Sequence, residues 1–85
     1  MSAKIQVKYW GELRTLTGKK DDELEASSVA ELIKQLEKTY GKAAAKEGKR
    51  MLIAVNGTNI QLLERCKTRL NEGDRVAFLP LSGGG

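Results

Sequence analysis

The sequence predicts one α+β domain in which a mixed sheet of four to five strands packs against one main helix. Three observations carry this prediction. Residues 4–9 alternate polar and apolar side chains, as a half-buried strand does. Residues 28–40 combine a helix-capping pattern with a single apolar stripe. Asn56-Gly57, the strongest two-residue hairpin signal, follows the apolar run at 51–55. Strands that both precede and follow one helix in the chain indicate two layers, one of sheet and one of helix.

The first third of the chain predicts two strands joined through a short helical turn. The strand at 4–9 ends at Gly11, and residues 12–17 (ELRTLT) form one turn that closes at Gly18. Residues 22–26 (DELEA) form a weaker second strand. The apolar side chains expected to face the core from these segments are Ile5, Val7, Tyr9, Leu13, Leu16, Leu24 and Ala26.

The helix at about 28–40 has the clearest signals. Ser28 and Glu31 have the spacing of a capping box, in which each side chain satisfies an orphan backbone N–H. Gly41 stands where a left-handed C-terminal cap is expected. One apolar stripe, which indicates packing of a single face on a sheet, consists of Val29, Leu32, Ile33, Leu36 and Tyr40.

The remaining segments predict three strands. Residues 42–50 (KAAAKEGKR) are polar and basic, and their three alanines extend at most one helical turn. The run at 51–55 is a strand, and residues 58–63 (TNIQLL) return from the hairpin with Ile60 and Leu62 in phase. Residues 71–74 (NEGD) form a turn before the last strand, Arg75 to Leu79. This order matches the β-grasp (ubiquitin-like) fold, whose first and last strands are parallel neighbours at the sheet centre.

Composition limits the classes of partner. The net charge is +4, but the lysines are scattered, so we expect solvated surface and no nucleic-acid partner. No apolar run approaches the about 18 residues of a membrane span. One cysteine and no histidine exclude a disulfide framework and the usual zinc clusters, and we expect no metal site and a cytoplasmic location.

Strand phase predicts an apolar patch on the face of the sheet opposite the helix. If Tyr9 faces inward, Trp10 points outward, and Leu79 points outward when Phe78 is buried. In parallel neighbouring strands the two outward side chains meet. Exposed tryptophan and leucine together indicate a docking patch. The alternative is that Trp10 folds over residues 12–17 and completes a minor core.

Pro80 closes the domain expected at residues 1–80, and residues 81–85 form a glycine-rich tail. Glycine lacks a Cβ, so such a tail can enter a narrow channel and present its terminal carboxylate, which is anionic at neutral pH. Using a carboxylate for chemistry requires activation, for instance as an acyl-adenylate. A frayed end and a cloning remnant are the alternatives.

Three segments carry a resemblance to a known family. They are KIQVKYWGELRTLTG at 4–18, LIAVNG at 52–57 and LNEGDRVAFLPLSGGG at 70–85. Together they resemble the ubiquitin-like sulfur carriers of the MoaD/ThiS type, most of all the small subunits of molybdopterin synthase. The resemblance covers nearly the whole chain, and its sharpest part is the spacing of the last strand and the terminal glycines.

The resemblance implies a carrier that is not catalytic alone. An adenylating enzyme of the ubiquitin-activating type, using ATP and Mg²⁺, would activate the carboxylate of Gly85, and sulfur transfer would make a thiocarboxylate. The large subunit of molybdopterin synthase would then receive the tail and use the sulfur for the molybdopterin dithiolene. No tightly bound cofactor is implied. The matching site residues are Gly85 and Gly84 for the chemistry, and Trp10, Leu79, Pro80, Leu81, Ser82 and Gly83 for partner binding.

The chain departs from the family pattern at the root of its tail. The family usually has two prolines where this chain has Pro80 and Leu81, which predicts a less rigid root. Gly83 replaces a small or hydroxyl residue, unless Gly84 is the true end and Gly85 an addition. Asn59 stands where the family often has an apolar contact residue, which predicts a smaller patch.

The remaining polar candidates have structural explanations beside their functional ones. For Cys66 the functional alternatives are a sulfur relay and an oxidation sensor. We favour the structural alternative, a small semi-buried residue. Asp74 is expected to stabilise its turn rather than hold Mg²⁺ or a phosphate. Lys8, Arg14 and Lys67 are treated as exposed charges that a tail-binding groove of a partner can meet.

Other functions remain open at this level. A sulfur carrier can serve thiamine, cysteine or tRNA thiolation instead of molybdopterin. A ubiquitin-like modifier joins the same glycine to protein lysines. A ubiquitin-like binding module uses the folded domain alone and leaves the tail inert.

Overall fold

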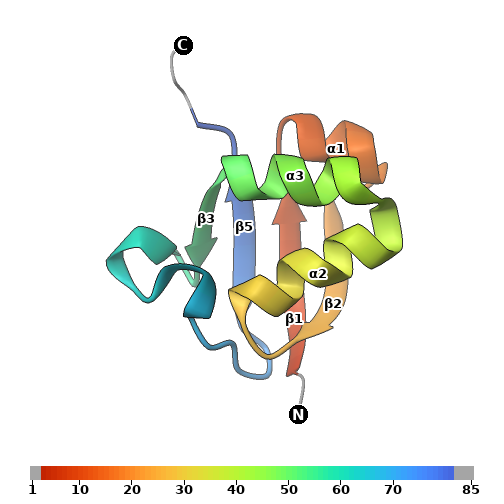
Figure 1. The fold of residues 1–85 in the computed structure, drawn as a ribbon. Coiled ribbons are helices and arrows are strands. Elements are labelled where there is room, and N and C mark those ends of the chain that lie inside the picture. The colour runs from red at the N-terminus through yellow and green to blue at the C-terminus, as the bar shows by residue number, and fades with distance from the viewer. Residues whose placement is uncertain (1–2, 82–85) are drawn as a thin grey trace.

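The computed structural model describes residues 3–81 and shows a five-stranded mixed sheet with helices packed on one face (Figure 1). The predicted fold class, an α+β domain of the β-grasp type, is confirmed. Among residues 3–81 no helix is long and apolar enough to cross a membrane. The elements are β1 (Ala3–Tyr9), α1 (Glu12–Thr17), β2 (Asp21–Ala26), α2 (Val29–Tyr40), α3 (Lys42–Arg50), β3 (Leu52–Val55), β4 (Thr58–Asn59), β5 (Arg75–Leu79) and the 3₁₀ turns η1 (Ile60–Leu62) and η2 (Arg65–Lys67).

The first and last strands lie side by side at the centre of the sheet. The strand order is β2-β1-β5-β3-β4, and β1 runs parallel to β5 with Tyr9 opposite Phe78. The other neighbours are antiparallel. Figure 1 shows α2 and α3 crossing the same face of this sheet, while the strand ends of β1 and β5 point the same way. The predicted parallel centre is therefore confirmed.

The core lies between this central pair and the helices. Tyr9 and Phe78 are fully buried, and their ring centroids are 6.2 Å apart. Burying an aromatic or large aliphatic side chain stabilises a fold by about 1.5–3 kcal/mol. Leu32 and Leu36 of α2 and Leu13 of α1 are also fully buried in this cluster. The inward phase predicted for β1 and β5 is correct because both strands alternate buried and exposed residues.

The capping of α2 differs in detail from the predicted box. The Ser28 side chain accepts a hydrogen bond from the Glu31 N–H at 3.2 Å, as expected. The Glu31 carboxylate, however, accepts from the N–H of Ser27 at 2.7 Å rather than from that of Ser28. Gly41 has φ 101° and ψ 172°, so the predicted left-handed helical cap is wrong. Its conformation is still one that favours glycine, and it turns the chain directly into α3.

The nine-residue helix α3 was not predicted. Its buried side is made only of small residues, Ala44, Ala45 and Gly48, so no large apolar stripe marks it in the sequence. The small side chains allow close packing on the core. A Cβ placed on Gly48 would lie 3.2 Å from Leu36 Cδ1 and 3.3 Å from Phe78 Cε2. The expected single main helix is therefore two consecutive helices.

The strand predicted at residues 58–63 is wrong beyond its second residue. β4 stops at Asn59, whose side chain accepts a hydrogen bond from the Gln61 N–H at 2.9 Å and turns the chain into η1. Ile60 is buried, but Leu62 is 80% exposed. The two apolar side chains that looked in phase as a strand therefore point in different directions.

The hairpin turn between β3 and β4 and the turn that precedes β5 are joined by side-chain hydrogen bonds. Asn56 and Gly57 both have positive φ, at 51° and 86°, as a tight hairpin turn requires. The Asp74 carboxylate accepts from the Asn71 N–H at 2.9 Å and from the Asn56 side-chain amide at 3.1 Å. The turn-stabilising role predicted for Asp74 is confirmed.

One carboxylate ties β2 to the central strand and to α2. Asp22 accepts hydrogen bonds from the hydroxyls of Tyr9, at 3.0 Å, and Tyr40, and Lys19 Nζ lies 3.5 Å from its other oxygen. Partial burial pushes the Asp22 pKa up, but the hydrogen bonds from Tyr40, the Glu23 N–H and Tyr9, with the Lys19 charge, outweigh it, so the pKa is lowered. Burial and the nearby Asp22 charge raise the pKa of Tyr9.

We expect the Asp22→Asn variant to lose stability at neutral pH and to lose less in acid. A carboxyl whose pKa is lowered by folding contributes stability above its unfolded pKa, near 3.8, and this contribution disappears as the pH falls through the folded pKa. Urea unfolding at pH 7, 5, 4 and 3 measures the difference between the two proteins. A difference that stays constant over this range would contradict the assignment.

Candidate functional site

The ends of the central strands place an apolar patch on the outer face of the sheet, opposite the helices. Leu79 pairs with Leu52, and Trp10 directly follows Tyr9, the last β1 residue paired with β5. Since Tyr9, Phe78 and Ile53 point into the core, these three neighbours point outward. We call the outward residues of this region the outer patch: Trp10, Leu52, Ala54, Ala77 and Leu79.

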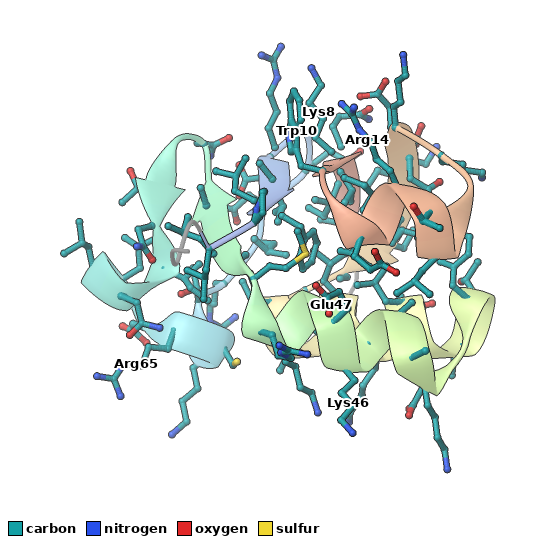
Figure 2. The ribbon with its side chains drawn as sticks, turned by 90° about the horizontal axis from the view of Figure 1, so that it is seen from above. Lys8, Trp10, Arg14, Lys46, Glu47 and Arg65 are labelled. Atoms are coloured by element: carbon teal, nitrogen blue, oxygen red, sulfur yellow. The ribbon has the colours of Figure 1, made fainter. Side chains whose placement is uncertain are left out.

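Trp10 lies outside the buried core and is 37% exposed. The guanidinium of Arg14, from α1, lies 4.2 Å from the centroid of the Trp10 ring, and its Nε donates a hydrogen bond to the Tyr9 carbonyl at 2.9 Å. Figure 2 shows Lys8, Trp10 and Arg14 together on one side, with Lys46 and Glu47 on the helical side. Trp10 thus contacts residues 12–17, as the alternative expected, but through the guanidinium of Arg14, and it is not part of the buried core.

A shallow hollow of ≈ 560 Å³ continues the outer patch along the sheet. Ala54 and Ala77, which are paired across β3 and β5, line it together with Leu79. Their small side chains leave the backbone of the sheet open to contact. Lys8 and Arg75 supply positive charge at its border, and Asp21 supplies one negative charge. The arrangement, apolar at the centre and charged at the rim, is typical of a protein-binding surface.

The root of the tail is held by contacts with the body. Pro80 packs on Gly11, where an added Cβ would lie 3.5 Å from the Pro80 Cβ and 3.9 Å from the Met51 Cε. Gly11 has φ 58° and ψ −137°, a conformation that favours glycine. Leu81, the last residue described, is 62% exposed. The chain direction is thus fixed as far as Pro80, although the second proline of the family pattern is missing.

The structure brings together only some of the predicted site residues. Trp10, Leu79, Pro80 and Leu81 gather where β5 ends. Four other predicted residues lie outside the described range: Ser82, Gly83, Gly84 and Gly85. Their roles, and the partner-binding role of the outer patch, stay predictions.

Sequence reasoning missed Leu52 and misplaced Cys66. Leu52 starts a run of entirely apolar residues, so no alternation marks its outward side, and only the pairing with Leu79 reveals it. Cys66 is exposed, not semi-buried, because η2 lies on the surface. Lys67 is also exposed in η2 rather than part of the outer patch.

The side chains present offer no metal centre in the part of the chain that the structure describes. Within residues 3–81 no cluster of three or more cysteine, aspartate or glutamate side chains has a geometry that could hold a metal ion.

A comparison of the sequence with known protein families shows which family this chain belongs to. The sequence profile of the ThiS family matches residues 7–85, from the first strand through the terminal glycines. The chain belongs to the ThiS family. Together with the structural likeness below, this places it among the ubiquitin-like sulfur carriers and modifiers. A search of curated proteins finds no match.

Solved structures agree with the ThiS family assignment. The small archaeal modifier protein 1 (SAMP1) from Methanosarcina acetivorans is 26% identical with a TM-score of 0.86, over 100% of this chain and 99% of that one. A chain in the BexX/CysO complex of Amycolatopsis orientalis is 25% identical with a TM-score of 0.81, over 95% and 99%. The putative molybdopterin converting factor subunit 1 of Pyrococcus furiosus is 26% identical with a TM-score of 0.71, over 93% and 98%.

Proposed function

We propose that this ThiS-family chain is a sulfur carrier and serves as the small subunit of molybdopterin synthase. The observation that carries the proposal is the family match through residue 85, combined with a folded body that fixes the chain up to Pro80. The likeness to the putative molybdopterin converting factor subunit 1 of Pyrococcus furiosus favours molybdopterin synthesis over the other pathways that use a sulfur carrier. The body supplies recognition, and Gly85 supplies the reacting group.

The proposed chemistry takes place in partner enzymes. The Gly85 carboxylate attacks the α-phosphorus of Mg²⁺-bound ATP in an adenylating enzyme, and pyrophosphate leaves. A sulfide-level sulfur nucleophile then adds to the acyl-adenylate carbonyl and displaces AMP, which leaves a thiocarboxylate on Gly85. Activation is necessary because a carboxylate itself is a poor electrophile. Gly84 and Gly83 contribute by lacking side chains, so that the tail can enter a narrow channel.

The outer patch is the proposed recognition surface for both partners. Trp10, Leu52 and Leu79 are large apolar groups next to the root of the tail. A partner that covers them also receives the tail, since residues 82–85 follow Leu81 directly. Large side chains near the centre of an interface carry most of its binding energy. Arg14 holds the exposed ring of Trp10 in one orientation before the partner arrives.

The first test measures the intact mass of the chain after incubation with ATP, Mg²⁺, sodium sulfide and the adenylating partner. We expect a gain of about 16 mass units, because sulfur replaces one carboxylate oxygen. The chain without Gly84 and Gly85 is the matched control and should stay unchanged. An unmodified mass of the full chain, with an active partner enzyme, would contradict the proposal.

The second test separates the outer patch from apolar surface in general. We expect Leu79→Lys to weaken binding to the adenylating partner at least about tenfold, which corresponds to about 1.4 kcal/mol. Leu62→Lys is the matched control, because Leu62 is 80% exposed and lies in η1, outside the patch. Binding is measured by isothermal titration calorimetry. Equal affinities for the two variants would show that the outer patch is not the surface that binds the adenylating partner.

A second candidate is protein modification through the same glycine. The likeness to SAMP1 of Methanosarcina acetivorans, at a TM-score of 0.86, favours it specifically. In that case the activated Gly85 would be joined to lysine amines, with AMP leaving. Mass spectrometry of cell extracts that express the tagged chain separates the two functions, since trypsin cuts after Arg75 and a modifier therefore leaves the remnant VAFLPLSGGG on lysines. A carrier that only delivers sulfur leaves none.

A further inference from the structure

A second hollow, of ≈ 330 Å³, opens beside β3, and Leu52 of the outer patch lines its edge. It lies between the end of α3, the start of β3 and the turns η1 and η2, and we call it the side groove. Met51 and Ile60, which belong to the buried core, form part of its apolar floor. Leu81, the last described residue, is 62% exposed and also lines this groove, so the described chain ends at its edge.

The rim of the side groove is positively charged. Lys49, Arg50 and Arg65 line it, and among residues 3–81 no aspartate or glutamate does. Arg50 lies 3.8 Å from Glu47, but neither Lys49 nor Arg65 forms an ion pair within the described residues. Figure 2 shows Arg65 on a different side of the molecule from Trp10 and Arg14. Two cations therefore remain available to an anion that enters the groove.

The chain itself supplies a fitting anion. Four residues follow Leu81, and they reach about 13–14 Å when extended. Because Leu81 lines the same groove as Arg65, that length brings the final carboxylate within reach of the rim. Three of the four residues are glycines, so their backbone can lie on the apolar floor without steric conflict. The terminal carboxylate is anionic at neutral pH and complements the rim.

We infer that the side groove is a carboxylate-binding site for the chain's own residues 82–85, with the terminal carboxylate on Arg65 and Lys49. The inference rests on the proposed function only in taking Gly85 as the terminal residue. In the free carrier the reactive end would then lie in the side groove, which meets the outer patch at Leu52. A partner that covers the outer patch would have to withdraw the tail from the groove before the carboxylate can react.

The test compares two forms of the chain by amide NMR, one ending in the Gly85 carboxylate and one in a Gly85 carboxamide. The carboxamide keeps the length and removes only the charge. We expect the largest shift differences at residues 59–66, with smaller ones on the outer patch. In Arg65→Gln these differences should shrink severalfold. Arg69→Gln is the matched control, since Arg69 is exposed, carries the same charge and does not line the groove.

Each other outcome overturns the inference. Differences confined to residues 78–81, or equal effects of the two arginine variants, would show that the groove does not hold the carboxylate. Differences that disappear on dilution would assign the site to the tail of a second copy. The thiocarboxylate assay is independent: sulfur loading without the shifts removes only this inference, whereas shifts without sulfur loading remove only the proposed function.

Discussion

The parallel pairing of β1 with β5 is the constraint on which the rest of the molecule depends. It places Tyr9 opposite Phe78 under the helices and, one residue later, places Trp10 and Leu79 on the opposite face. A slip of one residue in either strand would exchange buried and exposed side chains along its length. The same pairing sets where β5 ends and hence where the tail leaves the body. Core, outer patch and tail root therefore share one register.

In the proposed function, recognition and chemistry use different parts of the chain. Pro80 packs on Gly11 at the end of the body, and the group proposed to react lies beyond it. Such a division would let two different partners bind the same body while each reaches the same terminal group. The outer patch and the side groove adjoin at Leu52, close to the point where the described chain ends.

The sequence predicted those features whose signals are local and strong. Alternation in β1, the stripe of α2 and the Asn56-Gly57 turn each result from side chains close in the chain. It failed where packing decides: α3 buries only Ala44, Ala45 and Gly48, so helical periodicity is invisible without knowledge of Leu36 and Phe78. The side groove could not be predicted at all. Its rim combines residues from α3 and η2 that only the folded chain brings together.

Native-state amide hydrogen exchange tests the central claim most directly, because it measures the free energy of opening at each strand separately. If the β1–β5 pair holds the molecule together, its amides exchange only through global unfolding, with free energies equal to that from urea unfolding. Amides of η1 and η2 should exchange through smaller local openings. This role of the β1–β5 pair would be contradicted if β5 amides exchanged through local opening, with free energies well below that of global unfolding, while the amides of α2 stayed protected.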